Sequence, residues 1–147
     1  MNLAARTNQT LYFARISLNE SEQEEQPQEK RRKEEVALFH LYSSLTAFCN
    51  ELVQHYMLLP FSTPAELLAR DEAPAELQEL KLLLEQPESW LSTIIVQYER
   101  VLLVGLEQGA ANSNLITKQS DYTDLFRNTL NDMEKVIQRM REHSQEY

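Results

Sequence analysis

Apolar residues recur at intervals of three and four along most of the chain, a spacing that places them on one face of an α-helix. Residues up to about Leu58 show the clearest stripe: Leu38, Leu41, Leu45, Phe48, Leu52 and Tyr56. Tyr42, Cys49 and Val53 widen this stripe. A stripe of this width is typical of a central helix that contacts more than one neighbour.

Proline residues divide the chain into segments, because proline fits the first turn of a helix and excludes helical geometry from the residue before it. Pro27 predicts the start of the central helix and Leu59-Pro60 predicts its end. Pro74 and Pro87 predict two later starts. The expected helices are 3–22 (or from residue 7), 27–58, 64–70, 74–86, 87–108 and 122–143.

Capping residues refine three of these boundaries. Thr63 and Glu66 match a capping box, in which the hydroxyl and the carboxylate bind free amides at the start of a helix. Gly109 is expected in the left-handed conformation that ends the fifth helix, followed by a loop. Ser120 or Asp121 is then expected to cap the last helix.

Together these segments predict an all-α protein, an antiparallel bundle of four long helices plus one or two short connecting helices. The chain has 147 residues, so residues 1–147 are expected to form a single helical-bundle domain. Gly105 and Gly109 are its two glycines, which argues against a β-rich fold with many tight turns.

The formal net charge of −9 disfavours binding to nucleic acid, because the protein repels phosphate groups. One basic run, Lys30–Lys33, lies among acidic residues. Since consecutive helical residues point all around the axis, we interpret this run as a solvated helix start, with an RNA contact as the alternative.

A cytoplasmic location without a membrane partner is expected from the rest of the composition. Cys49 is the single cysteine, so no intramolecular disulfide is possible, as suits a reducing compartment. Residues 1–18 carry polar side chains within their apolar pattern, unlike a signal peptide, and no apolar stretch is long enough to span a bilayer.

The best candidate for chemistry is a polar cluster of Asn8, Tyr12, Arg15 and His40. His40 shares a helix face with small residues, and the other three have matching spacing on the first helix. If these helices pack together, the cluster is either a ligand pocket or acid–base site, or a hydrogen-bond network that fixes helix register. We favour the structural interpretation.

The sequence predicts neither a metal site nor a phosphate-binding loop. Glu51 and His55 are four residues apart, but no second Glu/His set accompanies them as in a di-iron bundle, so an exposed i, i+4 interaction is expected rather than a metal site. Two glycines nearly exclude a phosphate-binding loop. We expect no cofactor, no metal ion and no catalytic residue.

Two motifs suggest a relationship to other proteins. Arg6-Thr7-Asn8-Gln9 followed by Leu11–Ala14, and Ala37–Tyr42 with Cys49 and Glu51 after it, resemble a bacterial family of small helical proteins of unknown function. The resemblance implies a helical fold and a cytoplasmic location, and it transfers no activity.

Our preferred hypothesis is a noncatalytic helical interaction protein that binds a protein partner or self-associates, because the second and fifth helices carry apolar residues beyond a single stripe. The first alternative is a small-molecule-binding protein or weak hydrolase that uses the cluster around His40. The second is an RNA-directed nuclease. The Arg-to-His spacing of helical-bundle ribonucleases counts against it, because neither Arg32 with His40 nor Arg139 with His143 matches that spacing.

Overall fold

The computed structural model describes residues 2–106 and 122–145, which form six helices and no strands. The all-helical class predicted from the apolar periodicity is therefore confirmed for this part of the chain. The helices are α1 Leu3–Gln23, α2 Pro27–His55, α3 Pro64–Leu68, α4 Ala75–Leu84, α5 Trp90–Leu103 and α7 Thr123–Gln145.

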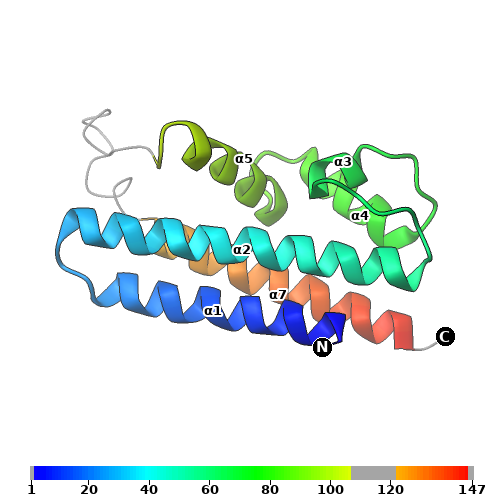
Figure 1. The fold of residues 1–147 in the computed structure, drawn as a ribbon, viewed down its shortest axis with the longest axis horizontal. Coiled ribbons are helices and arrows are strands. Elements are labelled where there is room, and N and C mark those ends of the chain that lie inside the picture. Colours follow the sequence, from blue (N-terminus) through cyan, green and yellow to red (C-terminus); the bar gives the residue numbers. More distant parts are fainter. Residues whose placement is uncertain (1, 107–121, 146–147) are drawn as a thin grey trace.

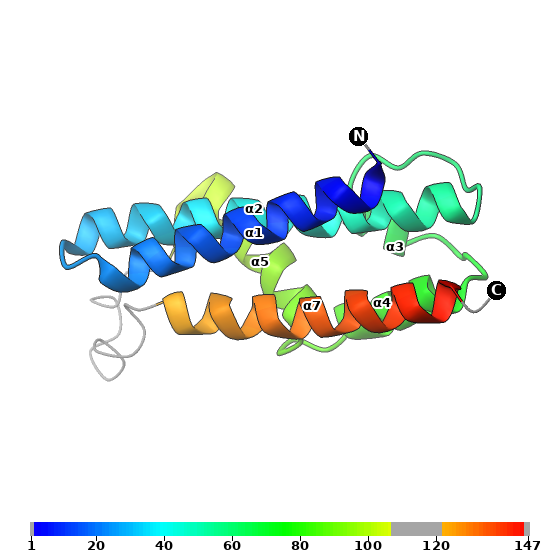
Figure 2. The ribbon, with the colours of Figure 1, turned by 90° about the horizontal axis from the view of Figure 1, so that it is seen from below.

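α1 and α2 form an antiparallel hairpin, and α7 lies along both of them (Figure 1). α3 and α5 cover the side of α2 that faces away from α1, α4 packs against α3 and α5, and α5 also packs against α7. Figure 2 shows that the start of α1 and the end of α7 lie at the same end of the molecule. Side chains from α1, α2 and α7 meet at this end.

The apolar stripes of the long helices meet in one shared interior, as expected from the burial of leucine-rich faces. Cys49 belongs to this core, and burial raises the pKa of its thiol to about 12, so the sulfur stays protonated. The largest fully buried side chains are Leu18, Leu38, Leu41, Leu45, Phe48, Leu67, Leu80, Leu91, Ile94, Phe126, Leu130 and Met133.

Small and hydroxyl-bearing side chains lie between α1 and α2. Thr10 and Ser44 are both buried, and their hydroxyl oxygens are 2.8 Å apart across the hairpin. Small side chains allow two helices to approach closely, which explains why this pair packs over most of its length. The buried residues of this kind on α1 are Thr7, Thr10, Ala14, Ser17 and Ser21.

Helix ends differ from the prediction in two places. α2 ends at His55 rather than near Leu58, because Met57 adopts a positive φ of 56° that breaks the helix. α5 ends at Leu103 rather than near residue 108, because Gly105, with φ 84°, already provides the left-handed residue. Gly109 lies outside the described residues.

Helix starts follow capping side chains more closely than prolines. The hydroxyl of Thr63 accepts a hydrogen bond from the amide of Glu66 at 3.1 Å, as predicted for α3. α5 begins at Trp90 rather than at Pro87, because Ser89 caps it through the amide of Ser92. Ser120 and Asp121, the expected caps of α7, lie outside the described residues.

Candidate functional site

Asn8 and Arg15 of the predicted polar cluster face α7. The amide oxygen of Asn8 accepts a hydrogen bond from Nη1 of Arg141 at 2.8 Å. Arg15 forms an ion pair with Glu134. Both residues therefore connect α1 to the last helix rather than to α2.

His40 and Tyr12 lie elsewhere on the hairpin. The imidazole of His40 packs against Phe13 of α1, with ring centroids 5.4 Å apart. Partial burial, with a smaller effect from the charge of Arg6, holds the pKa of His40 below its usual value. Tyr12 is 61% exposed. The structure thus brings His40 to α1, as predicted, but it separates His40 from Asn8 and Arg15.

Aromatic rings in contact connect α1 to α2 around His40: Phe13 lies 6.4 Å from Tyr12, and Phe39 lies 5.6 Å from His40, between ring centroids. We call these rings and the exposed apolar side chains near them the hairpin face. Tyr12 and Ile16 lie one turn apart on α1, and Val36 and His40 one turn apart on α2, so each pair shares a helix face. Tyr12 and Phe39 are more than half exposed. The hairpin face comprises Tyr12, Phe13, Ile16, Val36, Phe39 and His40.

A polar cluster joins α1, α2 and α7 where their ends meet, and we call it the end cluster: Thr7, Asn8, Glu51 and Arg141. The carboxylate of Glu51 accepts hydrogen bonds from Nη2 of Arg141 at 2.7 Å, from Nε at 3.2 Å and from the hydroxyl of Thr7 at 2.6 Å. The expected exposed interaction of Glu51 with His55 is wrong, because Glu51 binds Arg141 instead.

A cavity of about 320 Å³ adjoins the end cluster, and we call it the end cavity. Glu51 and Arg141 form part of its wall, and His55 lies beside them. The remaining lining is apolar and comes from the same three helices: Leu3, Ala4, Phe48, Leu52 and Met140. A mostly apolar pocket with a few convergent polar groups is typical of a small-molecule site.

A second carboxylate, Glu34, holds the other end of α7. It is fully buried, and Oε2 accepts hydrogen bonds from the backbone amide of Tyr122 at 2.7 Å and the hydroxyl of Thr123 at 2.9 Å. Arg31 binds Oε1 at 3.1 Å and lies over the Tyr122 ring. We call these four residues the inner cluster.

The inner cluster corrects our interpretation of the basic run Lys30–Lys33 as a solvated helix start. The Arg31 side chain is only 12% exposed, because it is held between Glu34 and Tyr122. Sequence reasoning missed Glu34, which lies within a charged segment. The available signal was its position four residues before Leu38, at the start of the buried stripe of α2.

The comparisons with known proteins give a family. The model of DUF6586, a family of unknown function, matches residues 1–147. The chain belongs to the DUF6586 family. The expected membership of a family of unknown function is thereby confirmed. No curated protein and no solved structure matches the chain.

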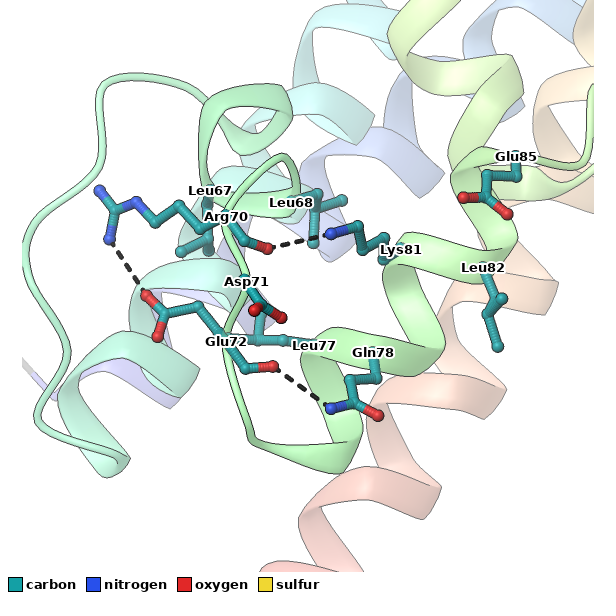
Figure 3. A pocket seen from close by; sticks show the side chains of 10 residues that line it. All are labelled: Leu67, Leu68, Arg70, Asp71, Glu72, Leu77, Gln78, Lys81, Leu82 and Glu85. Atoms are coloured by element: carbon teal, nitrogen blue, oxygen red, sulfur yellow. Dashed lines mark hydrogen bonds and ion pairs between the residues drawn. The ribbon is translucent and has the colours of Figure 1, made fainter.

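This DUF6586 chain has a further cavity, of about 260 Å³, between α3 and α4 (Figure 3). Its polar side chains bind the surrounding backbone and one another: Lys81 donates to the carbonyl oxygen of Arg70 at 3.1 Å, and the Arg70 guanidinium pairs with Glu72. Gln78 donates to the carbonyl oxygen of Glu72. These contacts hold the connection between α3 and α4, so the cavity is a weaker ligand candidate.

The described residues contain neither a metal-binding cluster nor a membrane-spanning helix. Within residues 2–106 and 122–145, no group of three or more His, Cys, Asp or Glu side chains is arranged to hold a metal ion. None of the helices described combines the length and the apolar character needed to cross a bilayer. The hairpin face presents exposed apolar side chains, and the end cavity combines an apolar lining with three polar residues, Glu51, Arg141 and His55.

Proposed function

We propose that this member of the DUF6586 family is a noncatalytic helical interaction protein that self-associates through the hairpin face. The scaffold in this proposal is an antiparallel bundle in which α4 and α5 together provide the fourth long segment. The observation that supports the function is the exposure of four large apolar side chains across two neighbouring helices: Tyr12 61%, Phe39 53%, Val36 38% and Ile16 37%. Contiguous apolar patches on soluble proteins commonly mark interaction sites.

The surroundings of His40 favour association over catalysis. His40 packs against Phe13, and its lowered pKa keeps the imidazole neutral near pH 7. Asn8 and Arg15, the groups expected to act with it in a hydrolase, bind α7 instead. His40 thus contributes aromatic surface to the hairpin face.

Charges on α1 favour a second copy of the chain as the partner. Arg6 and Glu20 are both exposed, and each lies seven residues from Phe13, about 10 Å along the helix. Seven residues are two helical turns, so both charges lie on the side of α1 that carries Phe13. The hairpin face thus has a positive end and a negative end.

A two-fold axis that lies in the interface and runs across the helices stacks α1 on α1 of the second copy in the antiparallel sense. Phe13 then meets its counterpart, and Arg6 of each copy lies opposite Glu20 of the other. A two-fold interface must be self-complementary in this way. The apolar centre supplies most of the binding free energy, and the two charge pairs select the antiparallel arrangement.

Light scattering after size-exclusion chromatography tests the proposal. We expect the wild type at micromolar concentration to have twice the mass of the 17.2 kDa chain. Phe39→Glu places a charge in the hairpin face and should give a monomer. Leu82→Glu is the matched control, because Leu82 is at least as exposed as Phe39, 61% against 53%, but lies on α4.

A charge exchange tests the partner and its orientation. Arg6→Glu and Glu20→Arg should each weaken the dimer at least tenfold, because like charges then face each other twice. The double variant restores both pairs and should recover association. A monomeric wild type overturns the proposal, and a double variant as weak as the single variants overturns the antiparallel arrangement.

A further inference from the structure

The end cavity has the shape and lining of a site for a small molecule with an apolar body. Its volume of about 320 Å³ falls within the usual range of ligand pockets, roughly 300–1,000 Å³. Phe48, Leu52 and Met140 form its deepest wall, since each is at most 4% exposed. An apolar ligand placed there removes further apolar surface from water, which favours binding.

The end cavity does not share the negative charge of the whole chain. Arg141 neutralises Glu51 through the paired hydrogen bonds from Nε and Nη2. His55 lies on the exposed rim, and the first turn of α1, which supplies Leu3 and Ala4, carries no acidic side chain. The cavity is therefore neutral or weakly positive, whereas the whole protein has a charge of −9.

Arg141 also retains hydrogen-bond donors for a ligand. A guanidinium group has five N–H bonds, and the contacts with Glu51 and Asn8 use three of them. The two others, one on Nη1 and one on Nη2, lie at the edge of the guanidinium that these contacts leave available to the oxygens of a carboxylate. Glu51 and Asn8 fix the orientation of this edge, so a ligand need not order it on binding.

We infer that the end cavity binds a small amphipathic monocarboxylate, an aliphatic or aromatic acid. Its apolar body lies against Phe48, Leu52 and Met140, and its carboxylate is bound by Arg141 with His55 beside it. A cationic ligand would meet the guanidinium without a free carboxylate to pair with, because Glu51 is already bound by Arg141 and Thr7. A neutral ligand would gain the apolar contacts alone.

Isothermal titration calorimetry with three probes of equal chain length tests the head group. The probes are hexanoate, hexanol and hexylammonium, and 3-phenylpropionate replaces hexanoate to test an aromatic body. We expect binding of one or both carboxylates in the millimolar range or tighter, and at least tenfold weaker binding of hexanol and hexylammonium. Hexylammonium or hexanol binding as well as the carboxylates would overturn the inference, as would no binding of either carboxylate.

A matched pair of variants tests the location. Ala4→Trp fills the end cavity from its α1 wall and leaves the Glu51–Arg141 contact in place, so carboxylate binding should be lost. Ala5→Trp changes the adjacent exposed residue, which does not line the cavity, and should bind normally. Circular dichroism confirms that both variants are folded. Unchanged binding by Ala4→Trp would overturn the site.

His55→Gln then tests the rim. Because His55 is exposed, this variant should fold normally and bind hexanoate several-fold more weakly, and binding equal to the wild type would remove His55 from the site. The inference does not depend on self-association. A monomer that binds hexanoate contradicts the proposed function alone, and a dimer that does not bind it contradicts this inference alone.

Discussion

The inner cluster and the end cluster hold the two ends of α7 with the same chemistry in different surroundings. In each, a carboxylate of α2 accepts a hydrogen bond from a threonine hydroxyl and pairs with an arginine. Glu34 and Glu51 are about 25 Å apart along α2, at 1.5 Å per residue. Glu34 is fully buried, whereas the Glu51 side chain is 15% exposed and borders a cavity.

This difference indicates that the inner cluster contributes mainly to stability, whereas the end cluster is available for binding. At the inner cluster, Glu34 accepts a hydrogen bond from the amide of Tyr122, the residue before α7, where the helix dipole adds to the attraction for a carboxylate. Glu34 is shielded from solvent there, so water cannot replace it as a partner if its carboxylate is removed. At the end cluster, solvent and the adjoining cavity weaken the contribution to folding and leave part of Arg141 accessible.

The largest effect is expected from Glu34→Ala, which should lower the free energy of unfolding by about 3–5 kcal/mol. The substitution leaves the guanidinium of Arg31 and the amide of Tyr122 buried without their carboxylate partner. Urea denaturation followed by circular dichroism measures the change. If the variant does not fold, Glu34→Gln, which keeps the side-chain shape, should still show a clear loss.

Glu29→Ala provides the control for this experiment. Glu29 forms an ion pair with Arg32, also near the start of α2. Both side chains of that pair are at least half exposed. Glu29→Ala should therefore leave the urea midpoint almost unchanged. A loss for Glu34→Ala no larger than that for Glu29→Ala would contradict the conclusion that the buried inner cluster stabilises the fold more than an exposed ion pair does.

Glu51→Ala should have an intermediate effect, a loss of roughly 1–2 kcal/mol, because water can solvate part of the exposed Arg141 side chain. A double-mutant cycle with Arg141→Ala separates the ion pair from the other contacts, and we expect a coupling energy of about 1 kcal/mol. If Glu51→Ala were as damaging as Glu34→Ala, the two ends would be equivalent and the comparison would fail.

The helices themselves were predictable from the sequence, and their partners were not. The stripe from Leu38 to Leu52 is a local pattern, and local periodicity is sufficient to indicate a helix and its buried face. The end of α5 was misplaced because two glycines follow it, and the local pattern does not show which one adopts a positive φ. Gly105 does so.

The inner cluster and the end cluster form between helices that are far apart in the sequence. A local sequence pattern does not show how such helices align. Arg141 is 90 residues from Glu51, and Thr123 is 89 residues from Glu34. In the folded protein Asn8 faces α7, where it binds Arg141, whereas His40 of α2 contacts a different side chain of α1, Phe13. The spacing of these residues alone was compatible with one cluster.

The smallest expected effect is a pH dependence from His40, which lies on α2 between the two carboxylates. Burial lowers its pKa in the folded protein, with a further contribution from Arg6, whereas the unfolded chain keeps a value near 6.5. Below about pH 6.5 the unfolded state therefore binds more protons than the folded state, and stability falls as the pH falls toward the lowered folded pKa. Above this window the contribution is constant.

Urea denaturation between pH 5 and 8 should therefore show a shallow loss of stability on the acidic side, and His40→Gln should reduce that loss. The same loss in His40→Gln as in the wild type would mean that other groups cause it. The result also gives the pH at which the stabilities of Glu34→Ala and Glu51→Ala should be compared. At about pH 7.5 the imidazole is neutral in both states, so differences between Glu34→Ala and Glu51→Ala then reflect the carboxylates alone.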